Sequence, residues 1–216
     1  MPSRIFPFVN GQFYHIDNRG VEKRTIFEKN WDYSRLIKTI KYYQLIGPKP
    51  KLSRFLVGSI FKPDNDKKIV EIICYCLMPN HFHFLVKQLK DGGVTEFISK
   101  LSNSYTKYYN VKYNRVGPLL QGEFKAVLIE SDEQLVHISR YIHLNPVVSF
   151  LVKNLSQYRW SSYKEYIANE TNGISSKETI ISFFKSPEGY EKFVLDQIDY
   201  AQKLEIVKHQ LLDIED

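Results

Sequence analysis

The chain has 216 residues and a mass of 25.5 kDa, which predicts one domain with or without an extension and leaves enough chain to bury a core. Hydrophobic residues make up 43% and charged residues 25%, values that exclude disordered, collagen-like and coiled-coil chains. No apolar run approaches the roughly 20 residues that a membrane helix needs, and residues 1–10 lack the pattern of a signal peptide. We therefore expect no membrane partner and a cytoplasmic location.

The chain contains two cysteines, Cys74 and Cys76, which lie two positions apart in an apolar run. A strand would point both side chains the same way, with little chance of a bond between them. A disulfide-based scaffold is therefore excluded.

Positive charge is concentrated before the C-terminal tail. The net charge is +6, yet residues 1–68 carry 14 Lys and Arg against 6 Asp and Glu, whereas residues 186–216 carry 3 against 8. Such a balance favours a polyanionic partner, and 15 Tyr and 14 Phe offer faces on which unpaired bases could stack. A solvated basic surface would give the same composition, so composition alone leaves both interpretations open.

The first half of the chain is predicted to begin with a strand and a helix. Alternating aromatic and polar residues predict a strand over residues 12–17, and helical spacing predicts a helix over residues 31–45 that stops before Gly47. Residues 49–68 are basic and rich in turn-forming residues, so they are interpreted as an irregular surface insertion.

A hairpin and a second helix follow. Residues 69–77 and 81–87 have strand patterns on either side of the turn at residues 78–80. The next helix is predicted to be capped by Thr95 and to end before Gly117.

Residues 123–129 predict a fourth strand, and Ser131 begins a capping box for another helix, which Pro146 is expected to end. The order β-α-β-β-α-β plus a helix is that of an α+β, ferredoxin-like split βαβ (RRM-like) core with an antiparallel sheet. We expect a catalytic domain over residues 1–150, which includes the insertion at residues 49–68, and a helical C-terminal extension with an acidic tail over residues 151–216. This fold serves enzymes and RNA-binding modules alike, so it does not decide the function.

Two histidines could form a ligand pair for a metal ion. His81 and His83 begin a predicted strand, and the period of two sends both imidazoles to one face. A bare His-x-His pair is more often only hydrogen-bonded, so further residues are needed to support a metal site.

Tyr141 and Asn145 provide such support. They lie four apart on the helix that Ser131 caps and so share one face near its C-terminal end. An amide oxygen beside two imidazoles suits a divalent ion with open positions for water or phosphate, such as Mg²⁺ or Mn²⁺.

Two other arrangements compete with this interpretation. Cys74 and Cys76 could join His81 and His83 in a zinc site, but the cysteines precede a turn, on a different strand, and structural zinc ligands usually lie on turns or helix starts. His137 is one helical turn before Tyr141 and could act as a base or contact a ligand, although a surface position is the simpler interpretation.

A basic, aromatic segment is the candidate nucleic-acid surface. Residues 99–125 carry five Lys and Arg against Glu123 alone, namely Lys100, Lys107, Lys112, Arg115 and Lys125. Four tyrosines are interleaved with them, namely Tyr105, Tyr108, Tyr109 and Tyr113. Basic groups would follow phosphates while aromatic faces accept bases. For Tyr105 and Tyr108, a place in the core is the favoured alternative.

Two sequence runs resemble a known family. Residues 75–83 (YCLMPNHFH) and 141–146 (YIHLNP) resemble the single-tyrosine HUH (His-hydrophobic-His) transposases, most closely the REP-associated tyrosine transposase branch. Supporting matches lie in the family's order at residues 14–20, 117–125 and 159–163. Five ordered matches make coincidence an unsatisfactory explanation.

The resemblance implies a function and a site. Tyr141 would be the nucleophile, while His81, His83 and Asn145 would hold Mg²⁺ or Mn²⁺, Asn145 standing where some relatives carry Gln. The implied activity is cleavage and rejoining of single-stranded or hairpin DNA through a covalent 5′-phosphotyrosine link. It further implies a nucleoid-associated prokaryotic protein, either a monomer or a homodimer.

The matched runs and basic segments also supply candidate DNA contacts: Arg19, Lys107, Lys112, Arg115, Gln121, Lys125 and Arg140. Two alternatives stay open from sequence. One is an inactive or domesticated relative that binds hairpins. The other is a metal-free nucleic-acid-binding module of the same fold, although its expected aromatic motif is missing.

Overall fold

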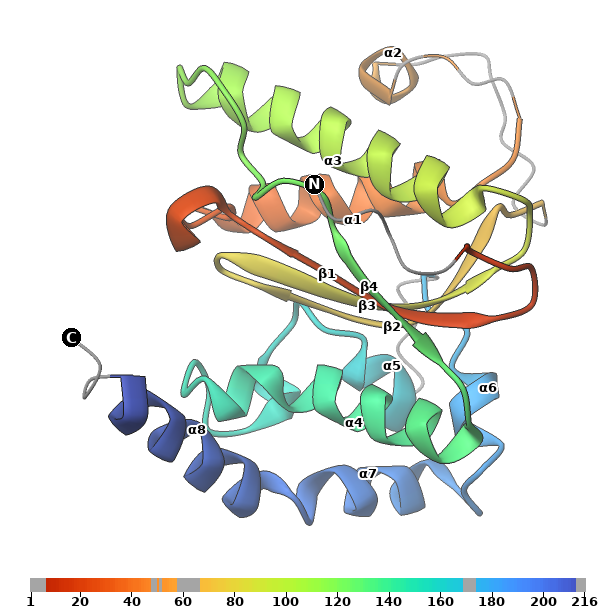
Figure 1. The fold of residues 1–216 in the computed structure, drawn as a ribbon, viewed down its shortest axis with the longest axis vertical. Coiled ribbons are helices and arrows are strands. Elements are labelled where there is room, and N and C mark those ends of the chain that lie inside the picture. Colours follow the sequence, from red (N-terminus) through yellow and green to blue (C-terminus); the bar gives the residue numbers. More distant parts are fainter. Residues whose placement is uncertain (1–6, 48–49, 51, 58–66, 169–173, 213–216) are drawn as a thin grey trace.

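The structure, a computed structural model, describes residues 7–47, 50, 52–57, 67–168 and 174–212. Its centre is one antiparallel sheet with the strand order β2-β3-β1-β4 (Figure 1). The strands are β1 (Phe13–Arg19), β2 (Val70–Met78), β3 (His81–Gln88) and β4 (Lys125–Ile129). The α+β, ferredoxin-like arrangement expected from the sequence is confirmed.

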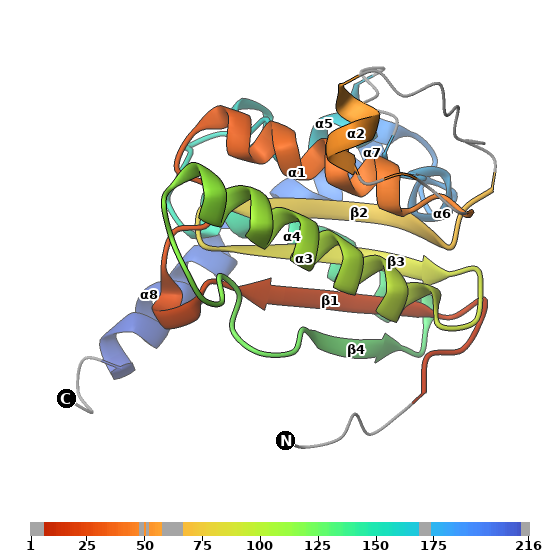
Figure 2. The same cartoon turned by 90° about the horizontal axis from the view of Figure 1, so that it is seen from above.

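Helices cover both faces of this sheet. On one face lie α1 (Asn30–Tyr43) and α3 (Gly93–Lys112), with the short α2 (Leu52–Leu56) beside them (Figure 2). On the other face lies α4 (Asp132–Val148) (Figure 1). A single turn of 3-10 helix, η1 (Val21–Lys23), follows β1.

The segment after α4 is helical, and it packs on the α4 side of the sheet (Figure 1). Its elements are η2 (Leu155–Gln157), α5 (Tyr163–Ile167), α6 (Glu178–Ile181), α7 (Pro187–Leu195) and α8 (Ile198–Leu212). Isolated bridges join Ser161 to Cys76 and Ser175 to Ile72, so the extension also protects the outer edge of β2. Tyr166 is fully buried there.

Alternation along the strands sends successive side chains to opposite faces of the sheet. Tyr14, Ile16 and Phe84 point toward α1 and α3 and are completely buried. Their neighbours along the strands, including Asp17 and His83, point toward α4 instead because successive side chains alternate between faces.

Two predicted helix boundaries are wrong. The helix α3 begins at Gly93, before Thr95, because Gly92 takes the left-handed conformation (φ 68°) that turns the chain into the helix. A side chain at position 93 would meet the carbonyl oxygen of Ile69 at 2.3 Å, so this turn needs glycine twice. Ser131 caps α4 as predicted, accepting a hydrogen bond from the backbone N–H of Gln134 at 3.2 Å.

Pro146 does not end α4, which continues to Val148. A proline in the last turn removes only one intrahelical donor, and Pro146 is buried in the core. Its carbonyl accepts from the backbone N–H of Leu151 at 2.9 Å, which turns the chain away from the helix.

Of the predicted insertion at 49–68, the structure describes α2 and the flanking residues 50, 57 and 67–68, while residues 49, 51 and 58–66 lie outside the described residues. Residues 1–6 of the N-terminal segment and residues 213–216 of the acidic tail also lie outside them. Within the part of the chain that is described, no helix is long and apolar enough to cross a bilayer.

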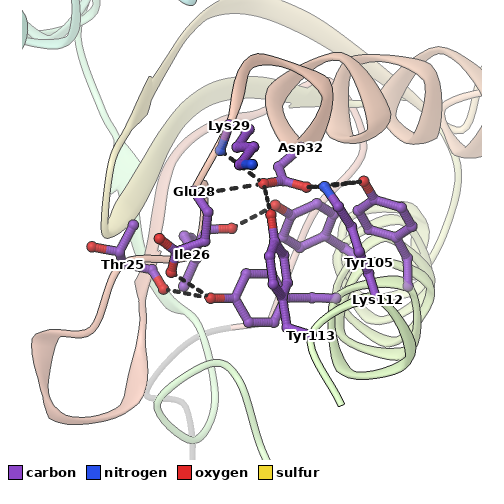
Figure 3. Close-up of polar contacts among 10 residues, drawn as sticks. Thr25, Ile26, Glu28, Lys29, Asp32, Tyr105, Lys112 and Tyr113 are labelled. Atoms are coloured by element: carbon purple, nitrogen blue, oxygen red, sulfur yellow. Dashed lines mark hydrogen bonds and ion pairs between the residues drawn. The ribbon is translucent and has the colours of Figure 1, made fainter. Parts of the chain in front are cut away.

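A buried carboxylate joins α1 to α3 (Figure 3). Asp32 is completely buried, and it accepts hydrogen bonds from the backbone N–H groups of Glu28 (3.1 Å) and Lys29 (2.9 Å) at the start of α1. From α3 and its end, Asp32 accepts bonds from the Tyr108 hydroxyl (2.9 Å), the Tyr113 hydroxyl (2.7 Å) and the Lys112 ammonium. The carboxylate therefore fixes the helix layer through several bonds at once.

Replacing this carboxylate is expected to destabilise the fold. Asp32→Asn leaves the Lys112 ammonium without its anion, and loss of hydrogen bonds between charged groups costs about 2–3 kcal/mol of unfolding free energy. Urea denaturation at pH 7 measures this difference. Asp199→Asn, at an exposed position, serves as the control and should stay within about 0.5 kcal/mol.

The difference in unfolding free energy between wild type and Asp32→Asn should also depend on pH. Burial opposes ionisation of Asp32, but bonds from Lys112, Tyr113 and their neighbours outweigh it and lower its pKa. The stabilisation is therefore complete above the unfolded-state value of about 4 and is lost as pH falls through the lower folded-state pKa. If the difference in unfolding free energy between wild type and Asp32→Asn stayed the same at all acid pH values, this would contradict stabilisation by the ionised carboxylate of Asp32.

Candidate active site

The site lies on the sheet face that α4 covers, at the ends of β1 and β3. Antiparallel register sets His83 opposite Asp17 and His81 opposite Arg19. The two histidines of the His-x-His pair therefore point to the same face, as the alternation predicted, and they share it with side chains of β1.

Three imidazoles are gathered here. His15 Nε2 and His83 Nδ1 are 3.0 Å apart, and the rings of His81 and His83 have centroids 5.0 Å apart. His81 Nδ1 is also 2.6 Å from Asn80 Oδ1, a contact that orients its ring. Burial lowers the pKa of His15 and of His81 to about 4, with Arg19 contributing for His81, and lowers the pKa of His83 strongly. All three are neutral near pH 7, the form that binds metal ions.

Tyr141 faces these rings from α4. Its ring centroid is 5.5 Å from that of His83 and 5.8 Å from that of His15, with both pairs nearly perpendicular. The residue is 49% exposed, so one side of it remains open to solvent. Partial burial, followed by the carboxylate of Asp17, raises the pKa of Tyr141, while the side chain of Asn145 lowers it in part. The phenol is therefore protonated at neutral pH.

Asn145 lies one helical turn after Tyr141. Its Nδ2 donates a hydrogen bond to the Tyr141 carbonyl at 2.9 Å. The predicted sharing of one helix face by these two residues is thus observed.

The donor atoms fit a divalent ion. One nitrogen each from His15 and His83 and one carboxylate oxygen from Asp17 all lie within 4.8 Å of one another. A mixed nitrogen and oxygen set of this kind suits ions such as Mg²⁺ or Mn²⁺. Sequence reasoning did not assign His15 and Asp17 to the metal, although both lie in the matched run 14–20 and alternate in step with the histidines.

The cysteines of the zinc alternative do not join this cluster. Cys74 and Cys76 are free thiols, fully buried in β2, and burial raises the pKa of both. A thiol must lose its proton to bind zinc, and this environment opposes that loss.

A buried polar network anchors α4. His143 Nδ1 lies 2.7 Å from the Tyr190 hydroxyl of α7, and its Nε2 lies 2.8 Å from Ser162 Oγ before α5. Ser139 Oγ also contacts the Tyr190 hydroxyl at 3.1 Å. Because His143 is fully buried, the network holds the middle of α4 against the C-terminal extension and so fixes where Tyr141 points.

His137 and Arg140 are turned toward α7 rather than toward the imidazoles. Arg140 Nη2 donates to His137 Nδ1 at 2.7 Å, and the Arg140 guanidinium lies 4.1 Å above the ring of Phe193. The structure therefore does not bring these two predicted candidates into the site.

Three of the predicted DNA contacts lie beside the site. Arg19 Nε donates to Gln121 Oε1 at 2.6 Å, and Lys125 is paired with Asp17 in the sheet register. Together with Asn18 and Glu123 they line a small pocket of about 150 Å³. Arg19, Gln121 and Lys125, called the rim below, place basic and amide groups beside the imidazole cluster on its β4 side.

The other predicted contacts lie on the far side of the sheet. Lys107 and Lys112 belong to α3, and Arg115 follows it, donating to Asn110 Oδ1 at 3.2 Å. The tyrosines of this segment are mostly inside. Tyr105 and Tyr109 are 1% and 4% exposed, and Tyr108 and Tyr113 are partly buried around Asp32. The core alternative for Tyr105 is confirmed, and the basic segment is not one continuous track to Tyr141.

Comparison with known proteins agrees with the fold and the motifs. A family model described as "Transposase IS200 like" matches residues 10–145. A structure of a REP-associated tyrosine transposase bound to a REP hairpin aligns over 82% of this chain and 90% of its own, at 15% identity and a TM-score of 0.58. A putative transposase from Deinococcus radiodurans aligns over 66% of this chain and 95% of its own, at 12% identity and a TM-score of 0.37.

A third structure, tRNA(His) guanylyltransferase from Saccharomyces cerevisiae, aligns over 89% of this chain and 75% of its own, at 11% identity and a TM-score of 0.32. No curated protein sequence matches significantly.

The chain belongs to the IS200-like transposase family. The predicted family is confirmed, and the fold agrees with that of the REP-associated tyrosine transposase. The protein is accordingly a transposase, a DNA-processing enzyme of DNA transposition and recombination.

Proposed function

We propose that this transposase cleaves and rejoins single-stranded or hairpin DNA through a covalent bond between Tyr141 and a 5′ phosphate. The observation that carries the proposal is the position of Tyr141, half-exposed on an anchored helix with its ring against His15 and His83. The membership of the family and the hairpin bound to the REP-associated relative support the same substrate class.

The chemistry of the step follows from the phenol. The Tyr141 oxygen attacks the phosphorus of a phosphodiester and loses its proton, while the bond from phosphorus to the 3′ oxygen breaks and that oxygen takes up a proton. One phosphate ester replaces another, so the energy of the bond is conserved. A different 3′ hydroxyl can then reverse the attack and join two strands without ATP.

His83 is central to the proposed metal site. It belongs to both candidate ligand sets, the pair with His81 completed by Asn145 and the cluster with His15 and Asp17. A bound Mg²⁺ or Mn²⁺ would polarise the phosphate and stabilise charge on the leaving oxygen. Burial raises the pKa of Tyr141 and so favours the protonated phenol, which is a weak nucleophile.

Residues of the rim would hold the DNA strand beside Tyr141. Arg19 and Lys125 offer positive charge to phosphates, and Gln121 offers an amide to bases or sugar. Their place next to Asp17 also balances the carboxylate, since both cations lower the pKa of Asp17 that burial raises.

A covalent-adduct assay tests the proposal. The protein is incubated with fluorescently labelled single-stranded DNA from its genomic flanks and Mg²⁺ or Mn²⁺, then separated under denaturing conditions. A labelled band at the mass of protein plus DNA is expected with the metal and not after chelation. Free cleaved DNA without any adduct would contradict a tyrosine-linked intermediate.

The form of the DNA substrate is a separate prediction. One nucleophile at one site cuts one strand, so single-stranded or hairpin DNA should bind more tightly than blunt duplex of equal length, by on the order of 10-fold at a fixed salt concentration of about 0.1 M. Fluorescence anisotropy titrations compare the substrates. Equal dissociation constants for duplex and hairpin would contradict the proposed preference for single-stranded or hairpin DNA.

A further inference from the structure

A basic cleft is lined by residues of α1, α2 and α3. These helices lie on the face of the sheet opposite α4 (Figure 2), the helix that carries Tyr141. The volume of the cleft is about 650 Å³. Four cationic side chains line it, namely Arg35, Lys100, Lys107 and Lys112. No carboxylate is among its described lining residues.

Two of the four cations are already neutralised. Lys100 Nζ lies 2.6 Å from a carboxylate oxygen of Glu96 one turn away, and Lys112 is bonded to the buried Asp32. Their positive charge is therefore balanced by anions outside the cleft lining.

Arg35 and Lys107 have no carboxylate partner among the residues that the structure describes. The Arg35 guanidinium lies 5.2 Å over the ring of Tyr108, and its Nε is buried without a hydrogen-bond partner. Burying a guanidinium donor without an acceptor is unfavourable, and this burial lowers the pKa of Arg35. An anion in the cleft would balance the positive charge that this guanidinium brings to the lining.

Phosphate is the anion that this lining fits. A guanidinium presents a planar fork of donors to phosphate oxygens, and an ammonium such as that of Lys107 adds a second charge. Ser53 and Ser104 contribute hydroxyl groups to the same lining. The cleft is open along α3 and much larger than one phosphate ion, which favours a phosphate within a longer strand.

We propose that Arg35 and Lys107 bind backbone phosphates of the DNA at this cleft, as a second contact remote from the cleavage site. This inference rests on the proposed function, because it takes DNA as the ligand. The sheet separates the cleft from Tyr141, so the DNA bound here is not the scissile segment, and the contact anchors the substrate without taking part in the chemistry.

Salt-dependent binding tests the cleft. The variant Arg35→Gln/Lys107→Gln is compared with Lys38→Gln/Lys41→Gln, which removes the same charge from exposed positions of α1 outside the cleft lining. The probe is a fluorescein-labelled hairpin of about 40 nucleotides with a single-stranded tail. Losing two phosphate contacts should reduce the slope of log K against log salt by about 1.4–1.8, whereas the control should change it by less than about 0.5.

The single variant Lys107→Gln tests the cleft even if the double variant misfolds, because the Lys107 side chain is exposed on α3. It should reduce the slope by about 0.7–0.9, against an unchanged slope for Lys38→Gln. Equal slope changes in cleft and control variants, or wild-type binding too weak to measure, would overturn the proposal.

Inorganic phosphate distinguishes a free anion from a strand. Titrated up to millimolar concentrations, it should not raise the melting temperature of wild type more than that of the double variant. A rise confined to wild type, with DNA slopes unchanged, would make the cleft a site for free phosphate and contradict the assignment to DNA. The adduct assay on the wild-type chain reports on the cleavage reaction and the salt slopes report on binding at the cleft, so failure of the proposed reaction is recognised separately.

Discussion

Tyr141→Phe is expected to abolish the covalent DNA adduct while DNA affinity stays within a few-fold of wild type. The substitution removes only the oxygen that would attack the phosphate, and the ring that contacts His15 and His83 remains. The adduct is measured by denaturing electrophoresis and the affinity by anisotropy. Tyr200→Phe, at a 62% exposed tyrosine of α8, is the control and should leave both unchanged.

An adduct that persisted in Tyr141→Phe would require another nucleophile. The tyrosines of α3 are poor substitutes, since Tyr105 and Tyr109 are buried and donate hydrogen bonds toward the start of α1. They also lie across the sheet from the imidazoles. The layer that stabilises the fold is therefore distinct from the layer that carries the chemistry.

His83→Ala is expected to remove cleavage and adduct formation, by about 100-fold or more. Its imidazole is the one shared by both candidate ligand sets, and it contacts the Tyr141 ring as well. Single-turnover cleavage with Mn²⁺ measures the loss, and binding of Mn²⁺ alone, followed by calorimetry, shows whether the metal site is lost with it. Full-rate cleavage by wild type after exhaustive chelation would contradict a metal-dependent reaction.

Neighbouring variants decide which ligand set completes the site. His81→Ala and Asn145→Ala should weaken Mn²⁺ binding, by about 10–100-fold for Asn145, if the set implied by the family motifs is used. His15→Ala and Asp17→Asn should weaken Mn²⁺ binding if the cluster of His15, Asp17 and His83 is used. Unchanged Mn²⁺ affinity in all four variants would contradict both candidate ligand sets.

The fold could be predicted because each element has its own local pattern. Alternation predicted β1, strand patterns on either side of the turn at residues 78–80 predicted the β2–β3 hairpin, and the capping residue Ser131 predicted the start of α4. His81, His83 and Tyr141 could be proposed as site residues because their motifs are short and local in sequence.

Other features depend on tertiary structure and were not predicted. His15 and Asp17 join the site only because β1 pairs with β3 in one register, which no local pattern specifies. The tyrosines of residues 105–113 suggested a stacking surface, but the hydroxyls of Tyr108 and Tyr113 donate to the buried carboxylate of Asp32. Pro146 continues its helix because core packing outweighs one lost hydrogen bond.

Mass spectrometry of the trapped adduct tests the central claim most directly. After nuclease treatment and trypsin digestion, the peptide spanning residues 141–153 follows Arg140, ends at Lys153 and contains Tyr141 as its only tyrosine. The proposed reaction predicts a 5′-phosphonucleotide on this tyrosine, present with Mg²⁺ or Mn²⁺ and absent after chelation. A nucleotide found on any other residue, or an adduct that forms equally without a divalent ion, would contradict it.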